Sequence, residues 1–341
     1  MRAVVAKAGA IEVQELPDPT PGPGQVLVAP SACGICGSDL HLLETQAAMP
    51  DLVPAIVLGH EYVGTILDYG PDTERTLPIG SVVTSVPYLD QPDGPQLIGL
   101  SPTVTGALAD VVVLQESRLV SVPSIPQPEY AALTEPLAVG VHAVGAADLA
   151  PGDVALVVGC GPVGLSVIAA LKAVGSVEVV AADYSSARRA LAEKFGADVV
   201  VDPAQTSPYT AWAQLAGPEI PPSPLVETLR RPRTVVFECV GAPGVLNSVM
   251  ESATPHTRIV VVGVCQQPDT ITPAIAIVKE LALRFAFAYR PDEFARASRW
   301  ITDGTVDVGP LVTATRTLAD AAGAFADLRN PEDHCKILLT P

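Results

Sequence analysis

The sequence is poor in positive charge, in aromatic residues and in uninterrupted hydrophobic runs. Lys and Arg number 20 against 37 Asp and Glu, so the formal net charge is −17. Nucleic acids and anionic membrane surfaces are bound mainly through Lys and Arg, and this balance argues against both as partners. The longest apolar run, near residues 155–173, is interrupted by Gly159, Gly161, Pro162 and Gly164. It therefore favours a strand, a turn and a helix over a membrane span.

Cysteine is also scarce. The six cysteines are scattered through 341 residues and form no disulfide framework, which favours a reducing compartment. The first residues, Met1–Lys7, lack the apolar core of a secretory signal, so we expect a cytoplasmic protein. The chain is long enough for two or three domains, and 48% hydrophobic residues can fill large cores.

The first 125 residues read as a β-rich domain. Short β-branched or alternating runs stand between Gly and Pro residues, at Gln25–Ala29, Tyr62–Leu67, Ser81–Ser85 and Asp110–Leu114. The segment Pro87–Pro95 contains three prolines and a glycine, and we expect an irregular loop there.

From about residue 151 the pattern becomes α/β. A short apolar strand at 153–159 leads into Gly159-Cys160-Gly161-Pro162-Val163-Gly164, which opens a helix and is followed by a second strand ending at Asp183. This context makes the Gly-x-Gly-x-x-Gly spacing a strong indication of a dinucleotide-binding unit. Further strands are expected at 197–201, 234–240, 258–264 and 281–288, an exposed loop at Gly217–Pro224, a helix near 292–302 and a last strand at 336–339.

Cys36, His60 and Glu61 offer a thiolate, an imidazole and a carboxylate. These are three zinc ligands of suitable softness, and they leave a fourth position for water or substrate, as a catalytic site requires. The alternatives are a buried or redox pair for Cys33 and Cys36 and a core histidine for His60. A redox pair would be expected in a thioredoxin-like unit, and a zinc knuckle would need a second Cys-x-x-Cys, which the sequence lacks.

Cys36 followed by Gly37-Ser38-Asp39 and His41, with Gly59-His60-Glu61 further on, resembles the zinc-dependent alcohol dehydrogenases of the medium-chain dehydrogenase family. The resemblance extends over nearly the whole chain. It implies an α/β protein with a GroES-like β-barrel catalytic domain, residues 1–140 completed by 289–341, and a doubly wound Rossmann domain, residues 141–288. Relatives with a second, structural zinc carry four cysteines in a lobe where residues 86–108 here have none. The chain is therefore expected to resemble the sorbitol, butanediol and threonine dehydrogenases without that lobe, and to bind one catalytic zinc.

The resemblance also implies roles for single residues. Cys36 and His60 correspond to zinc ligands, whereas the third ligand could be Glu61 or Glu135, and this choice stays open. Ser38 and His41 correspond to a relay that carries the substrate proton to solvent. Without the resemblance, Ser38 would be an ordinary turn serine and His41 an exposed loop residue.

For the cofactor we expect NAD. Gly159, Gly161, Pro162, Val163 and Gly164 would hold the pyrophosphate at the helix N-terminus. Asp183 would accept hydrogen bonds from the adenosine ribose and repel a 2′-phosphate. Arg188 lies where relatives place a basic residue beside the NAD ribose, although Arg188 or Arg189 could also receive a phosphate.

The predicted function is hydride transfer between an alcohol and NAD, with a secondary, apolar alcohol or its ketone as the small-molecule partner. The apolar preference rests on Leu42, Met49, Leu108 and Phe287, which offer few hydrogen-bond partners to a polyol. The alternatives are a zinc-dependent reductase of a C=N or C=O intermediate using NAD(P)H and a scaffold without turnover. The apolar strand at 281–288 predicts a homodimer or homotetramer, since an open edge of this kind needs cover.

Overall fold

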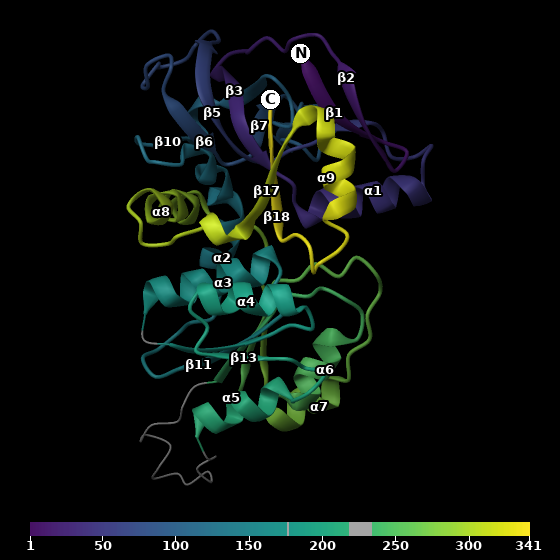
Figure 1. Ribbon diagram of the computed structural model, residues 1–341, viewed down its shortest axis with the longest axis vertical. Helices are drawn as coiled ribbons and strands as arrows, with labels where there is room; N and C mark the ends of the chain where they lie inside the picture. Colours follow the sequence, from purple (N-terminus) through teal and green to yellow (C-terminus); the bar gives the residue numbers. More distant parts are fainter. Residues whose placement is uncertain (176, 218–233) are drawn as a thin grey trace. The chain divides into compact units, whose positions relative to one another are not determined.

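The computed structural model describes residues 1–175, 177–217 and 234–341, and these form two compact units. Unit 1 comprises Met1–Glu135 and Phe294–Pro341, and unit 2 comprises Pro136–Glu293 (Figure 1). The division into catalytic and dinucleotide-binding domains at residues 140/141 and 288/289 stays a prediction. Of the loop expected at Gly217–Pro224, all but Gly217 lies outside the described residues.

Unit 1 is built around a mixed, mostly antiparallel sheet. Among the described residues, its strand order is β10-β6-β5-β3-β18-β17, and β9 also pairs with β3. The strands are β3 (Gln25–Gly34), β5 (Glu61–Tyr69), β6 (Val82–Ser85), β9 (Val112–Gln115), β10 (Leu119–Ser121), β17 (Val312–Thr317) and β18 (Lys336–Thr340). Because β18 inserts beside β3, the last residues of the chain complete the sheet begun by its first third.

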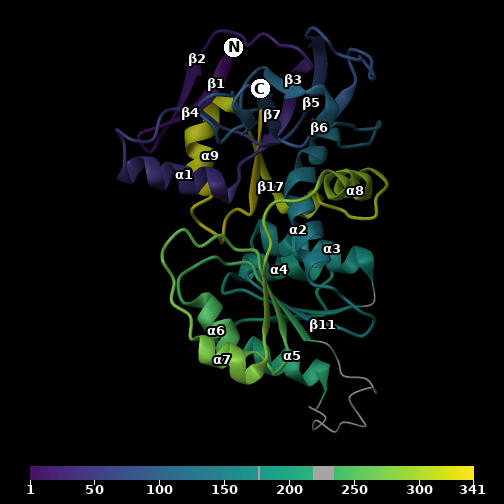
Figure 2. The ribbon, with the colours of Figure 1, turned by 180° about the vertical axis from the view of Figure 1, so that it is seen from behind.

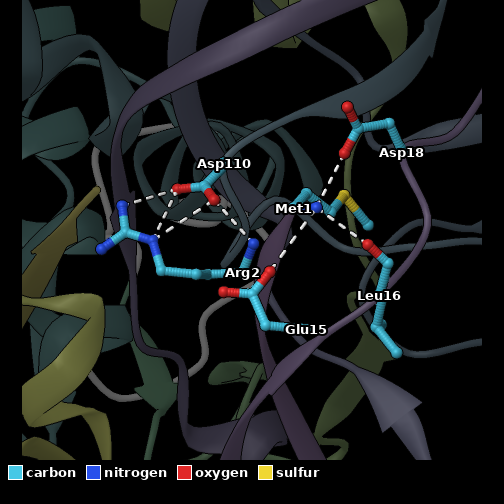
Figure 3. A network of polar contacts seen from close by, with 6 residues as sticks. All are labelled: Met1, Arg2, Glu15, Leu16, Asp18 and Asp110. Atoms are coloured by element: carbon cyan, nitrogen blue, oxygen red, sulfur yellow. Dashed lines mark hydrogen bonds and ion pairs between the residues drawn. The ribbon is translucent and has the colours of Figure 1, made fainter.

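A smaller sheet joins β1 (Arg2–Lys7), β2 (Ala10–Glu15) and β4 (Ile56–Val57). The first two residues hold it in place, as Figure 3 shows. The Met1 ammonium donates to Leu16 O and to Asp18, and the Arg2 guanidinium pairs with Asp110 at 2.7 Å. These contacts tie the N-terminal strand to the chain just ahead of β9.

The helical segments of unit 1 are short. They are α1 (Gly37–Ala48), α9 (Ala321–Asp327) and the 3₁₀ turns at Glu116–Arg118, Pro128–Leu133, Gly309–Leu311 and Leu318–Asp320. Val26, Val28, Leu58 and Ile66 are fully buried in the unit core, which also receives Ile337 from β18. Two helices cross the boundary between the units, α2 (Thr134–Ala146) and α8 (Pro291–Thr302).

One local expectation for unit 1 is wrong. The segment Pro87–Pro95 is not an irregular loop, because Tyr88–Gln91 (β7) and Gly94–Leu97 (β8) pair as a hairpin. Residues 37–48 form helix α1, so Ser38 and His41, which without the resemblance would be a turn serine and a loop residue, lie on a helix. This helix begins with Asp39 accepting from the Cys36 N–H at 2.9 Å, an N-terminal hydrogen bond that stabilises a helix without any amphipathic pattern.

Unit 2 is a parallel sheet with helices on both faces. Its described strands follow the order β13-β12-β11-β14-β15-β16, that of a doubly wound dinucleotide-binding fold. They are β11 (Val154–Val158), β12 (Glu178–Ala182), β13 (Val199–Val201), β14 (Thr234–Glu238), β15 (Arg258–Val261) and β16 (Ala282–Phe285).

Five helices of unit 2 follow these strands in turn. They are α3 (Pro162–Val174), α4 (Ser186–Lys194), α5 (Pro208–Ala216), α6 (Val245–Ser252) and α7 (Pro273–Lys279). Figures 1 and 2 show α3 and α4 on one face of the sheet and α5, α6 and α7 on the other. Trp212 of α5 is fully buried and donates to Val154 O, which fixes that helix against the sheet. Among the described residues, no helix is long and apolar enough to cross a membrane.

Candidate functional site

Cys36, His60 and Glu61 come together in unit 1. One ligand atom from each, the thiol sulfur, a ring nitrogen and a carboxylate oxygen, lies within 4.8 Å of the other two. Cys36 immediately precedes α1, His60 immediately precedes β5, and Glu61 is the first residue of β5, where it pairs with Gly34 of β3. The chain can turn into β5 only because Gly59 has a φ of +105°, and a Cβ there would lie 2.5 Å from a backbone nitrogen.

Asp39 orients the His60 ring. Its carboxylate is fully buried and lies 3.6 Å from His60 Nδ1, while Ser38 Oγ lies 3.3 Å from His60 Nε2. A carboxylate beside one ring nitrogen is the arrangement that fixes the tautomer of a metal-binding histidine. Burial opposes the charged imidazolium, but the negative charge of Asp39 and the contact with Cys36 more than offset it, so the pKa of His60 is raised.

Glu61 is held by a lysine that the sequence did not suggest as a site residue. Lys336 Nζ donates to both Glu61 carboxylate oxygens at 2.7 Å and to Ile35 O at 2.9 Å. Both side chains of the pair are 1% exposed. Gly34 leaves space for the carboxylate, since a Cβ there would lie 2.1 Å from Glu61 Oε2. The available signal was a charged residue at the start of the apolar run Lys336–Leu339.

Glu135, the other candidate ligand, lies near this cluster without joining it. It is half-buried in the first turn of α2, and its negative charge contributes to the raised pKa values of His60 and Tyr62. The group of three that meets within 4.8 Å contains Glu61. The two carboxylates therefore differ in position, Glu61 beside the thiol and imidazole and Glu135 at the range of charge interactions.

The two predicted relay residues lie on α1. Ser38 contacts His60, as described above, and His41 follows three residues later, hence on the same side of the helix. The His41 side chain is 44% exposed, with Nδ1 3.4 Å from Glu44 Oε2. Ser38 thus lies at the cluster, and His41 reaches solvent.

The donor set fits a divalent zinc-like cation. A thiol sulfur, an imidazole nitrogen and a carboxylate oxygen are zinc ligands, and three of them suit a site with an open position. His60 Nδ1 and Asp39 Oδ1 are buried polar atoms without a hydrogen-bond partner among the described residues. These two atoms lie 3.6 Å apart and face each other, so the support for a metal is the donor set itself.

The glycine-rich turn of unit 2 connects β11 to α3. Gly159 has a φ of +91°, and a Cβ at Gly164 would lie 1.9 Å from Gly159 O, so neither position accepts a side chain. Gly161 precedes α3, whose first residues are Pro162 and Val163, so backbone N–H groups at this helix start are available to an anion.

Asp183 follows β12 and lies beside this turn. Its two carboxylate oxygens accept from Cys160 N and Ser185 N, each at 2.8 Å. Arg188 also reaches the turn: its guanidinium carbon would lie 3.8 Å from a Cβ at Gly161, and its Nε is buried without a partner in the described structure. Arg189 is engaged elsewhere, since it donates to Asp183 O and Tyr184 O.

The apolar residues used for the substrate prediction lie in different parts of the fold, and one of them, Leu108, lies against Gly59, the residue before His60. Leu108 is fully buried within the core of unit 1, and Met49 ends α1 at the opposite end from Cys36. Leu42 packs partly against the core, and Phe287 belongs to unit 2.

Unit 1 thus carries a ligand set for metal-assisted chemistry, and unit 2 has the turn of a dinucleotide-binding fold. The chain matches the family model of the alcohol dehydrogenase GroES-like domain over residues 22–124 and that of the zinc-binding dehydrogenases over residues 162–303. It is 30% identical to (R,R)-butanediol dehydrogenase of Bacillus subtilis (strain 168), with 97% of this chain and 96% of that protein covered.

Sheep (Ovis aries) sorbitol dehydrogenase is 29% identical over 94% of this chain and 91% of its own length. The crystal structure of 2R,3R-butanediol dehydrogenase from Bacillus subtilis superimposes with a TM-score of 0.81 at 28% identity, covering 100% of this chain and 99% of that one. The chain therefore belongs to the zinc-binding alcohol dehydrogenase family.

Membership confirms several predictions from the sequence. These are the α/β fold with a GroES-like and a Rossmann part, the class of oxidoreductase, and zinc together with a nicotinamide dinucleotide, NAD or NADP, as cofactors. Family membership does not assign the ligand, relay and dinucleotide-binding residues one by one.

Proposed function

We propose that this protein oxidises a small secondary alcohol to its ketone with NAD, and catalyses the reverse reduction, at one zinc held by Cys36, His60 and Glu61. The observation that carries the proposal is the convergence of these three side chains within 4.8 Å, with His60 and Glu61 buried and Cys36 half-buried. Zinc at this position supplies a Lewis acid that lowers the pKa of an alcohol hydroxyl.

Ser38 is the first member of a proton relay in this proposal: its hydroxyl accepts the substrate proton as it gives up its own toward His41. Its hydroxyl lies 3.3 Å from His60 Nε2, so an alcohol oxygen bound at the cluster would be within its reach. His41 is on the same side of α1 and is 44% exposed, and it delivers the proton to solvent. Glu135 contributes negative charge near His60, and we propose that it orients water or substrate at the cluster.

NAD is proposed to bind at the glycine-rich turn of unit 2, formed by Gly159, Gly161, Pro162, Val163 and Gly164, where the pyrophosphate would meet backbone N–H groups at the start of α3. NAD supplies the hydride acceptor. Asp183 lies beside this turn and accepts from Cys160 N, which supports its role at the adenosine ribose. Arg188, with its guanidinium over Gly161, would contact the same ribose and phosphates.

The substrate class is proposed at two levels. A secondary alcohol is supported by relatives named as butanediol and sorbitol dehydrogenases. The finer preference for an apolar alcohol now depends on Leu42 and Leu108, because Leu108 lies against Gly59 next to His60, whereas Met49 lies at the opposite end of α1 from Cys36. Because these relatives are named for butanediol and sorbitol, a vicinal diol is the alternative substrate class to an apolar alcohol.

A substrate panel tests this proposal. NADH formation is measured with apolar secondary alcohols, vicinal diols and polyols, and the reverse reaction with ketones and cyclic imines. We expect the highest kcat/KM for a secondary alcohol. This activity should be lost in Cys36→Ser and retained in the control Cys265→Ser. Preference for an imine would favour the reductase alternative, and no turnover in a protein that binds zinc and NADH would favour the scaffold.

We also propose a homodimer or homotetramer in the cytoplasm. The β16 edge of the described sheet carries Phe285 and Phe287 at 73% and 78% exposure, and such an edge favours pairing with a second copy. The six cysteines are all free, which supports a reducing compartment. Light scattering should give at least a dimer, and Phe285→Asp should weaken it. The control Leu52→Asp changes an equally exposed residue of unit 1.

A further inference from the structure

The Lys336–Glu61 pair is a complete ion pair inside the candidate metal site. Lys336 Nζ lies 2.7 Å from both Glu61 oxygens, and each side chain is 1% exposed. The lysine comes from β18, 275 residues away in sequence. Burial opposes the charged ammonium, but the charge of Glu61 prevails and raises the pKa of Lys336.

Glu61 has little freedom to move away from this lysine. Its Oε2 lies where a side chain at position 34 would be, because a Cβ at Gly34 would be 2.1 Å away. β18 pairs with β3 next to that glycine, and Lys336 is anchored a third time by Ile35 O at 2.9 Å. The carboxylate is thus confined between Gly34 and the ammonium group.

We propose that Lys336 is a positioning residue that takes the place of the divalent cation in the metal-free protein, so that its ammonium and the cation compete for the Glu61 carboxylate. This inference rests on the proposed function in taking Cys36, His60 and Glu61 as the metal site. A cation bound by Glu61 must share a carboxylate with Lys336, and two like-charged groups are then held a few ångströms apart.

Two consequences follow from the charges. Lys336 weakens metal binding, because the repulsion between an ammonium and a divalent cation is strong where water is excluded. It also stabilises the empty site, because a buried carboxylate without a partner is costly. Removing the positive charge should therefore tighten metal binding and destabilise the metal-free protein, two effects that are linked thermodynamically.

The experiment measures zinc affinity by competition with a chelator at one fixed pH for all variants. Lys336→Met and Lys336→Gln remove the charge, and the expected result is a zinc Kd lower by about tenfold or more. Their melting temperatures should fall without zinc and recover when zinc is added. The control Lys279→Met removes a lysine of unit 2 that donates to Met250 O and Ala253 O, and its zinc Kd should not change.

Each possible change in the zinc Kd either supports the competition between Lys336 and zinc or contradicts it. If Lys336 only orients Glu61, its loss should weaken zinc binding by about 10- to 100-fold, as with other groups that support a ligand, and this result overturns the competition. An unchanged Kd also overturns it. If the unmodified protein binds no zinc, the proposed metal site fails, which is distinguishable from both results.

A structural comparison covers the case in which neither variant folds. Crystals of the unmodified protein are grown with and without zinc. The inference requires that zinc take one Glu61 oxygen and that Lys336 Nζ keep only the other. It is overturned if both oxygens remain on Lys336 while Glu135 coordinates the metal.

Discussion

Replacing Asp183 with Asn should weaken the preference for NAD over NADP. Asp183 accepts from Cys160 N and Ser185 N, and this places its negative charge beside the glycine-rich turn. A 2′-phosphate about 5 Å from that carboxylate, with about two negative charges and an effective dielectric constant of 40–80, is disfavoured by about 2–3 kcal/mol. This corresponds to roughly 30- to 150-fold discrimination, which Asn removes because it is neutral and similar in shape.

The assay compares kcat/KM for NAD and NADP with one alcohol. Asn is preferable to Ala, because its amide oxygen can keep one of the two backbone contacts, whereas Ala would lose both at about 1.5–3 kcal/mol each. Arg189→Ala is the matched control: it donates to Asp183 O and Tyr184 O, so its loss should affect stability and leave the cofactor ratio nearly unchanged.

Two results would contradict the proposed role of Asp183 in the preference for NAD. If the unmodified enzyme used NADP with the higher kcat/KM, the repulsion would be overcome, and Arg188 beside Gly161 would be the group receiving the phosphate. If Asp183→Asn left the NAD to NADP ratio within about threefold of the original, the carboxylate would not act on the 2′ position.

The remaining predictions concern the metal, the relay and the N-terminal contacts. Elemental analysis should find one zinc per chain and almost none in Cys36→Ser, which should still bind NADH, and two zinc ions per chain would contradict this. Ser38→Ala should lower kcat by about 10²- to 10⁴-fold, while His41→Gln should have a milder effect and flatten the pH profile, because solvent replaces an outer relay member; equal small losses would argue against the relay. Asp110→Asn should cost about 1 kcal/mol or less at neutral pH. The Arg2 hydrogen bond lowers the pKa of Asp110, so this contribution is present above about pH 4 and should vanish as the pH falls below it, as denaturation midpoints across pH would show.

Much of the site was visible in the sequence because its chemistry is local. Cys36, Ser38 and His41 lie within one short segment, and His60 and Glu61 are adjacent, so residue type and spacing were enough to nominate them. The nucleotide turn was equally clear, since the close approach of Gly164 to Gly159 O excludes any side chain.

The sequence did not predict helix α1, the β7–β8 hairpin or the core position of Leu108. Helix α1 lacks an amphipathic pattern, and its start depends on the hydrogen bond from Cys36 N to Asp39. The β7–β8 hairpin was hidden by its prolines, which usually exclude a strand but here occupy a short two-stranded ribbon. The core position of Leu108 could not be read from its apolar character, which suits a pocket as well as a core.

The two-part α/β organisation, the zinc-type donor set and the dinucleotide turn could be read from the sequence, because each depends on residue types within a few positions of one another. The grouping of Glu61 with the thiol and imidazole, and its ion pair with Lys336, became visible only in the folded chain. The physical reason is that β18 pairs with β3 about 300 residues after it in the chain. No local pattern can encode an ion pair formed across that distance.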